Sequence, residues 1–160
     1  GTRATVFHAG PLPFATPVCF EITYPDLIRR FRTNGAELVV NLSNDAWFGP
    51  VGYPELHLAH AVFRAIEGRT WVVRGANTGI SAAIDPTGQV RESLDAFTEG
   101  AFAVDVAPAG DAPFYARHGD GPALGAMAVG LGLALARPVR RRRDRLAIPT
   151  PRGRSAGSVR

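Results

Sequence analysis

The sequence predicts an α/β domain built in layers, because short apolar strands alternate with amphipathic helices along most of the chain. Runs typical of strands occupy residues 37–42, 71–74 and 80–85, and the first is apolar almost throughout, as in a strand buried on both faces. Apolar residues recur at helical spacing over 25–32 and 54–68. Strands alternating with helices, followed by hairpin-linked strands, are the order expected of a layered α/β fold.

The N-terminal elements surround Cys19, the only cysteine in the chain. Residues 4–8 are β-branched and aromatic and predict a short strand, and residues 16–20 predict a second strand that carries Cys19. Pro25 suits the first position of the next helix, where its missing N–H is not needed. Cys19 would then lie where a strand gives way to a helix, and the positive helix end would stabilise a thiolate. A small buried hydrophobic residue fits the same position, so both interpretations stay open.

A polar loop, residues 43–50, follows the strand at 37–42. Turn chemistry accounts for Asn44 and its polar neighbours without any function. It does not account for the adjacent aromatic residues Trp47 and Phe48. We therefore expect this pair either to pack onto the core or to line a pocket for an apolar ligand.

The helix expected over 54–68 carries His57 and His60 three residues apart, a spacing at which the two imidazoles could share a face. Nothing beside them completes a metal site, and we expect structural roles with no metal and no cofactor.

Residues 86–88 predict a hairpin turn into 89–91. Residues 100–106 alternate in character and predict a late strand.

The charge of the chain is divided between an acidic body and a basic tail. Residues 1–136 contain 9 Arg against 13 Asp and Glu, whereas residues 137–160 contain 9 Arg against one Asp.

The chain contains no Lys, does not begin with Met and shows no signal segment at its start. Gly1 is therefore expected to be a cut point in a longer protein.

Residues 121–136 contain no charged side chain, and six Arg follow within residues 137–145. A helix of this length spans about 24 Å, against about 30 Å for the hydrocarbon core of a bilayer. The glycine and alanine content suits close packing in a membrane, and the Arg cluster predicts a cytoplasmic end. We therefore expect a transmembrane helix, the alternative being a buried core helix with a solvated basic end.

These segments together resemble the carbon–nitrogen hydrolase (nitrilase) superfamily, and within it the apolipoprotein N-acyltransferase family. The resemblance covers about residues 1–120 and rests on separate blocks in the expected order. The blocks are Val18-Cys19-Phe20-Glu21, Asn41-Leu42-Ser43-Asn44-Asp45-Ala46-Trp47-Phe48-Gly49, His57-Leu58-Ala59 with Phe63-Arg64-Ala65-Ile66-Glu67, Arg74-Gly75-Ala76-Asn77-Thr78-Gly79-Ile80-Ser81, Ile84-Asp85-Pro86-Thr87-Gly88 and Pro113-Phe114-Tyr115-Ala116-Arg117-His118-Gly119-Asp120.

The resemblance implies a four-layer α-β-β-α body with a Glu-Lys-Cys catalytic set. Cys19 would take an acyl chain from a phospholipid as a thioester and pass it to the N-terminal amine of an S-diacylglyceryl-cysteine lipoprotein. Glu21 would be the supporting carboxylate beside the thiol. The residues implied to bind substrate are Phe20, Asn44, Trp47 and Phe48. The implied location is the bacterial inner membrane, with the catalytic part on the outer face.

The chain departs from the family pattern, because the family's Glu and Lys lie upstream of the cysteine. The 18 residues before Cys19 contain no Glu, and the whole chain contains no Lys. We therefore expect residues 1–120 to be the C-terminal part of the catalytic domain, 121–136 a transmembrane helix and 137–160 a disordered cytoplasmic tail. On its own the chain is expected to be inactive, since the base and an oxyanion donor are missing.

Three other functions remain as alternatives. A soluble amidase would use the same Cys19 chemistry with water as acceptor, although the apolar segment 121–136 argues against it. A non-catalytic, membrane-anchored remnant would explain the missing Glu and Lys. Nucleic-acid binding through the basic tail is disfavoured, because that tail has no interleaved aromatic residues.

Overall fold

The computed structural model describes residues 3–48 and 52–136. The chain divides into two compact units, Gly1–Ala123 and Leu124–Arg160. The expected tail at 137–160 lies outside the described residues.

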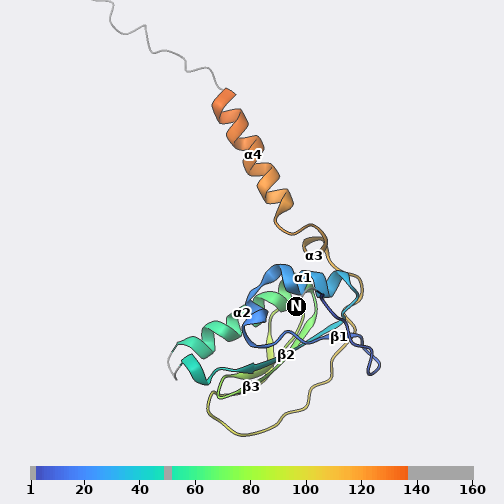
Figure 1. The fold of residues 1–160 in the computed structure, drawn as a ribbon, viewed down its shortest axis with the longest axis vertical. Helices are drawn as coiled ribbons and strands as arrows, with labels where there is room; N and C mark the ends of the chain where they lie inside the picture. The colour runs from blue at the N-terminus through green and yellow to red at the C-terminus, as the bar shows by residue number, and fades with distance from the viewer. Residues whose placement is uncertain (1–2, 49–51, 137–160) are drawn as a thin grey trace, which may run out of the picture. The chain divides into compact units, whose positions relative to one another are not determined.

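The first unit contains one mixed sheet of five strands in the order β1-β2-β3-β4-β5 (Figure 1). Its strands are β1 (Phe14–Ala15), β2 (Leu38–Asn44), β3 (Trp71–Asn77), β4 (Ser81–Ile84) and β5 (Val90–Leu94). The first three strands run parallel, and β3, β4 and β5 pair antiparallel. Each parallel step needs a crossover, and a helix follows both β1 and β2 along the chain.

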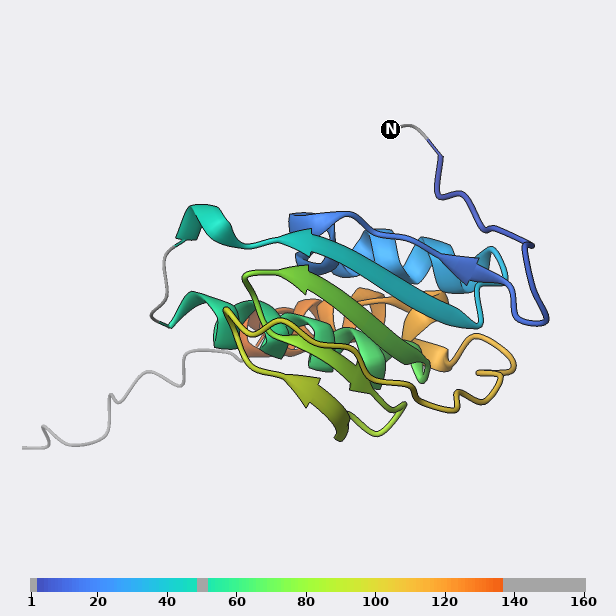
Figure 2. The same cartoon turned by 90° about the horizontal axis from the view of Figure 1, so that it is seen from below.

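Helices cover one face of this sheet, and the strands lie in front of α1 and α2 when the molecule is seen from below (Figure 2). The helical elements of this unit are η1 (Cys19–Thr23), α1 (Pro25–Thr33), η2 (Ala46–Phe48), α2 (Tyr53–Gly68) and α3 (Phe114–His118). Alternate residues of β2 and β3 are buried, as the two-residue period of a strand requires. The core lies between this buried face and the two long helices and consists of Ala15, Ile22, Ile28, Phe31, Ala36, Val39, Ala61, Ala65, Val72, Ala82 and Ile84.

The two long helices and the central strands lie close to where the sequence predicts them. Helix α1 begins at Pro25, with Tyr24 as its N-cap, and ends one residue beyond the predicted range. Helix α2 begins one residue before the predicted range and ends with it. The α/β fold class is therefore confirmed. The chain itself supplies one sheet and one helical layer of the four layers that the family resemblance implies.

The predicted strand at 16–20 is wrong, because regular pairing ends at Ala15 and Cys19 opens the 3-10 helix η1. Pro17 has no N–H to donate to a ladder. Val18 makes only an isolated bridge to Leu42. The carboxylate of Glu21 then accepts the Val18 N–H at 2.8 Å, which turns the chain into η1 instead of continuing the strand.

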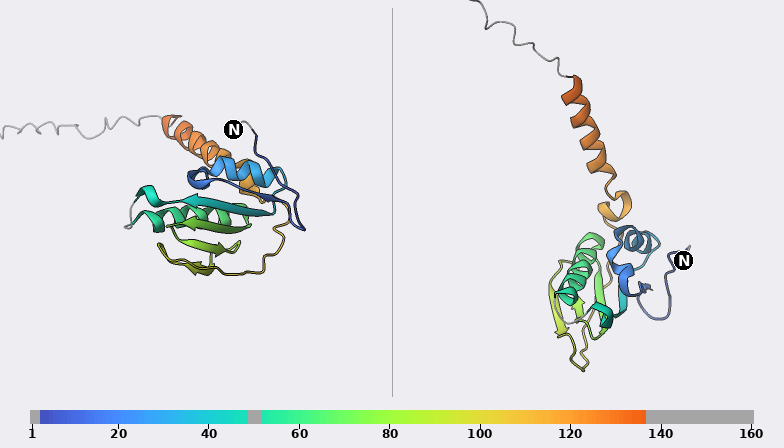
Figure 3. Two further views of the ribbon diagram at one scale, coloured as in Figure 1. Left: turned by 60° about the horizontal axis from the view of Figure 1, so that its bottom comes forward. Right: turned by 60° about the vertical axis from the view of Figure 1, so that its left-hand side comes forward.

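Two further strand predictions differ from the structure. Residues 4–8 contribute only an isolated antiparallel bridge between Phe7 and Phe14. Residues 100–106 adopt neither helix nor strand, and the whole connection 95–113 runs past the strands back to α3 (Figure 3). Alternating residues favour a strand only where a neighbouring strand supplies backbone partners. Helix α3 was not predicted, because five residues carry too little periodicity to be recognised.

The helix α4 (Gly121–Ala136) has the predicted bounds, and none of its residues is buried. Within residues 3–48 and 52–136, no helix is both long enough and apolar enough to cross a membrane.

Candidate active site

Cys19 lies at a sharp turn of the backbone, as the first residue of η1 after the bridge at Val18. Its φ is +51°, in the left-handed region that side chains other than glycine seldom occupy. Such a conformation costs about 1–3 kcal/mol and persists only where the surroundings impose it. The half-buried thiol lies 4.0 Å from the backbone oxygen of Asn44, to which S–H is a weak donor. We call residues 17–19 the Cys19 elbow.

Glu21 supports this elbow through the backbone. One carboxylate oxygen accepts the Val18 N–H at 2.8 Å, while the Glu21 N–H donates to the Val18 carbonyl at 3.0 Å. The side chain is otherwise exposed. The structure therefore places the Glu21 carboxylate on the backbone directly before the thiol, and its expected role in supporting catalysis stays a prediction.

Exposed aromatic side chains lie on the elements around the elbow. Phe20 is 48% exposed and meets Tyr24 edge to face, with ring centroids 5.8 Å apart. Trp47 is 87% exposed, so it does not pack onto the core, which was one of the two options left by the sequence. The side-chain oxygen of Asn44 accepts the Ala46 N–H at 3.2 Å and forms the turn into η2. The side chain of Phe48 lies outside the described part of the structure.

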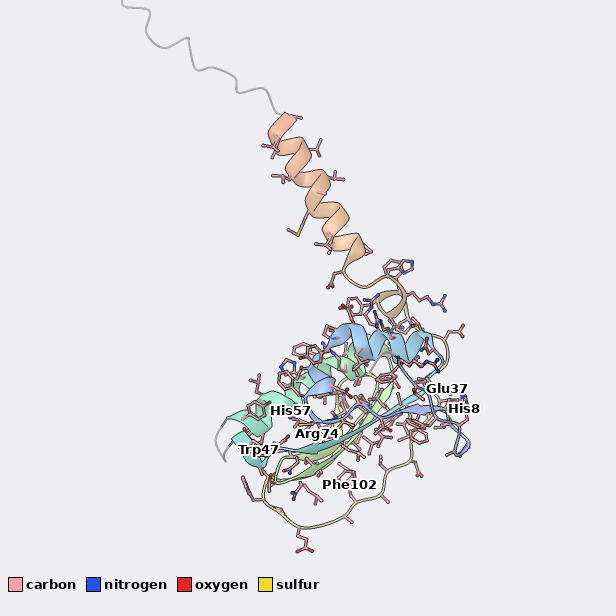
Figure 4. The ribbon with its side chains drawn as sticks, in the orientation of Figure 1. His8, Glu37, Trp47, His57, Arg74 and Phe102 are labelled. Atoms are coloured by element: carbon pink, nitrogen blue, oxygen red, sulfur yellow. The ribbon has the colours of Figure 1, made fainter. Side chains whose placement is uncertain are left out.

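A buried polar network lies directly under the elbow, and we call Asn41, Asp45, His57 and Arg74 the buried network. Arg74 Nη1 donates to Asn41 Oδ1 at 2.6 Å, and Arg74 Nη2 donates to Asp45 Oδ2 at 2.5 Å. The other oxygen of Asp45 lies 3.0 Å from His57 Nδ1. All four side chains are at most 2% exposed. Figure 4 shows His57 and Arg74 close together within the body, with Trp47 at the same end of the sheet.

The charges of this network are balanced within the protein interior. Burial opposes ionisation of Asp45, but the Ser43 hydroxyl, Arg74 and His57 outweigh it, and the pKa of Asp45 lies below its ordinary value. Burial and the nearby Arg74 lower the pKa of His57, although Asp45 and the Cys19 backbone partly offset the shift. At neutral pH the network therefore contains ionised Asp45, charged Arg74 and neutral His57.

Sequence reasoning anticipated a structural role for His57 but missed Asn41, Asp45 and Arg74 as a group. The signal was present, since each of two apolar strands carries one polar residue at a buried position. Asn41 and Arg74 are also register partners in the parallel pair β2 and β3. Among the residues that the structure describes, no group of three His, Cys, Asp or Glu could hold a metal ion.

Comparison with known proteins confirms the family resemblance. The carbon-nitrogen hydrolase family matches residues 2–110. The apolipoprotein N-acyltransferase of Geobacter metallireducens is 40% identical over 120 residues, which cover 75% of this chain and 23% of that protein. The one from Bradyrhizobium diazoefficiens is 41% identical over 142 residues, covering 86% and 26%. The chain thus spans about a quarter of the length of these curated relatives.

Solved structures show the same fold at low sequence identity. An amidase from Nesterenkonia sp. matches with a TM-score of 0.55 and 20% identity, over 77% of this chain and 46% of that one. Nit3 of Saccharomyces cerevisiae, a member of the nitrilase superfamily, matches with a TM-score of 0.50 and 19% identity, over 62% and 39%. On the family match and this shared α/β fold, the chain belongs to the carbon–nitrogen hydrolase family, and its resemblance to the apolipoprotein N-acyltransferases is borne out at about 40% identity.

Proposed function

We propose that this chain is part of an N-acyltransferase in which Cys19 is the nucleophile. The thiolate attacks the ester carbonyl of a phospholipid, the C–O bond breaks, and the lysophospholipid leaves with a proton. The N-terminal amine of an S-diacylglyceryl-cysteine lipoprotein then attacks the thioester carbonyl. An amide forms, the C–S bond breaks and the thiol is restored, so that one difficult transfer proceeds in two easier steps.

The observation that carries this proposal is the conformation of Cys19. A left-handed, half-buried cysteine at the first residue of η1 is strained, and such strain is typical of functional positions. Relatives at about 40% identity are named apolipoprotein N-acyltransferases, which supports an acyl acceptor other than water. A buried cysteine with only a packing role would not need a positive φ.

The proposed acyl-binding surface consists of the exposed aromatic residues next to the elbow. Trp47 and Phe20 present apolar rings to solvent. We assign Phe48 and Asn44 to the same surface by their positions in and beside η2. The acyl chain of a phospholipid is apolar, so contact with these rings would remove apolar surface from water on both sides.

The other catalytic groups of the family are a general-base Glu and a Lys that supports the oxyanion. The chain has no Lys. We propose that residues 1–120 are the C-terminal part of a four-layer catalytic domain and that both groups come from outside this chain. Glu21 would keep the elbow in shape through the Val18 N–H instead of acting as that base.

The proposal also gives α4 a role in the membrane. Its sixteen residues carry no charge and none is buried, so an apolar surface runs around the helix. A helix that is apolar all round is typical of a lipid environment. We propose that residues 121–136 belong to a membrane segment of the bacterial inner membrane, with the catalytic part on the outer face and residues 137–160 on the cytoplasmic side.

The identity of the acyl acceptor tests this proposal. The protein that carries this chain is incubated with labelled phospholipid and an S-diacylglyceryl-cysteine peptide, and the products are separated by mass spectrometry. We expect the label in an amide at the peptide N-terminus, lost completely in Cys19→Ala. Label released as free fatty acid regardless of the peptide would indicate an amidase-like hydrolase, and no Cys19-dependent product would indicate a non-catalytic remnant.

A further inference from the structure

The Cys19 elbow is held on its buried side by the side chain of Asn41. Asn41 Nδ2 donates to the carbonyl oxygen of Pro17 at 2.9 Å and to that of Cys19 at 3.4 Å. These two carbonyls lie on either side of Val18, so a single amide binds the chain before and after the turn. The Leu42 N–H adds a further bond to the Pro17 carbonyl at 3.3 Å.

The direction of the Asn41 amide is fixed by Arg74. Arg74 Nη1 donates to Asn41 Oδ1 at 2.6 Å, and a guanidinium can only donate. The amide oxygen must therefore face Arg74, which leaves the amide nitrogen facing the elbow. A flipped amide would oppose donor to donor on one side and carbonyl to carbonyl on the other.

Arg74 is itself held in place by several partners. Its Nη2 donates to Asp45, and its Nε donates to the Ile80 carbonyl at 3.1 Å. Asp45 is fixed in turn by the Ser43 hydroxyl at 2.6 Å and by His57 at 3.0 Å. Buried hydrogen-bonded networks of this kind favour one geometry, because any other leaves polar groups unpaired in a low dielectric.

We propose that Asn41, oriented by Arg74, is a positioning residue that keeps Cys19 in its left-handed conformation. The inference rests on the proposed function, since it matters only if Cys19 is the nucleophile. Its consequence is that the thiol keeps one direction relative to the acyl carbonyl, and misplacement by about 1 Å can cost 10²-fold in rate. The polar residues buried inside two apolar strands then have a functional reason, which packing alone does not supply.

The test compares Asn41→Asp with Thr70→Val. Asn41→Asp keeps the size of the side chain and its contact with Arg74 but removes both N–H donors to the elbow. Thr70→Val is the matched control, because Thr70 is also buried and its hydroxyl donates to the Glu37 carbonyl at 2.9 Å, outside the buried network. If Asn41→Asp does not fold, Asn41→Ala replaces it, since its neutral side chain also carries no hydrogen-bond donor.

Two readouts are taken on the protein that carries this chain. The first is the rate of thioester formation from phospholipid per folded molecule: we expect at least a tenfold fall in kcat for Asn41→Asp, with KM within twofold, and less than a twofold change in Thr70→Val. The second is the pair of ¹³Cα and ¹³Cβ shifts of Cys19, which report whether its backbone stays left-handed. We expect these to change only in the Asn41 variant.

Equal kcat values in Asn41→Asp and Thr70→Val, or an unchanged Cys19 backbone in Asn41→Asp, would overturn the inference and leave the proposed function standing. If the unaltered protein forms no thioester, the proposed function fails instead. The chemical shifts then still decide whether Asn41 holds the elbow.

Discussion

The backbone strain at Cys19 predicts an unusual order of stability for two substitutions at this position. At a φ of +51° alanine is strained, whereas glycine is not, so Cys19→Gly is expected to be more stable than Cys19→Ala by about 1 kcal/mol. At the exposed residue Arg30, inside helix α1, the ranking is reversed, with Ala more stable than Gly by about 1 kcal/mol. Urea unfolding of the four variants measures both differences. Ala more stable than Gly at both positions would show that Cys19 does not occupy the left-handed region.

Two glycines close to the buried network predict opposite tolerance to alanine. A Cβ at Gly79 would clash with Asp45 Oδ2, whereas a Cβ at Gly75 would meet Leu42 Cδ2 at an ordinary 3.7 Å. Gly79→Ala is therefore expected to destabilise the protein by about 1–3 kcal/mol through overpacking against Asp45. Gly75→Ala should stay within about 0.5 kcal/mol of the parent. Chemical denaturation of the pair checks this, and equal stabilities would contradict the close approach.

At the scale of elements, the β4–β5 hairpin depends on Asp85. This buried carboxylate accepts bonds from the Thr87 N–H and hydroxyl and from the Gln89 N–H, and it pairs with Arg91. Burial opposes ionisation, but these bonds outweigh it and lower the pKa of Asp85 from 3.8 to about 2. Because the folded pKa is the lower one, the associated stability is complete above about pH 4 and is lost as the pH falls towards 2.

The shift corresponds to roughly 2 kcal/mol of the free energy of unfolding. Asp85→Asn is expected to remove this part of the pH dependence, because the amide cannot ionise. Asp95→Asn, at an exposed position just after β5, is the control and should retain this pH dependence of the free energy of unfolding. Unfolding by urea between pH 2 and 5 measures the three curves, and a parallel decline in the parent and Asp85→Asn would refute the assignment.

Hydrophobic periodicity predicted the long elements and failed where backbone hydrogen-bond partners decide the structure. The apolar spacing of α1 and α2 was sufficient to place both helices, because amphipathic helices of this length carry a repeated signal. The apolar run before Cys19 resembled a strand, but Pro17 and the Glu21 cap ended the ladder. The alternating residues 100–106 found no neighbouring strand. The missing neighbouring strand is not visible in the local sequence, whereas Pro17 and Glu21 are local signals that hydrophobic periodicity does not register.

The candidate site was predicted in part. Cys19 was recognisable as the lone cysteine in a family motif, and Trp47 as an aromatic residue that turn chemistry left unexplained. The buried network was not foreseen, because its residues come from β2, β3 and α2 and meet only after the strands pair in register. The contact between Asn41 and Arg74 forms only when β2 and β3 pair, so the sequence of neither strand reveals it alone.

At the scale of the whole molecule, the apolar surface of α4 predicts that the protein associates with lipid. The protein that carries this chain should float with phospholipid vesicles in a density gradient, because the helix exposes apolar surface all round. A charge in the middle of the helix, as in Leu131→Asp, is expected to weaken binding at least tenfold, since a charged side chain in the bilayer centre costs about 2.5–3.5 kcal/mol. Leu131→Ile is the matched control, and equal flotation of both variants would contradict a role for α4 in the membrane.

The central claim is that Cys19 carries the acyl chain. The most direct measurement is mass spectrometry of the Cys19 peptide after the protein that carries this chain has been mixed with phospholipid and no acceptor. The account predicts one acyl adduct on Cys19, removed by neutral hydroxylamine as a thioester is, and absent in Cys19→Ala. The account would be contradicted if Cys19 stays unmodified in a preparation that acylates the acceptor peptide once that peptide is added.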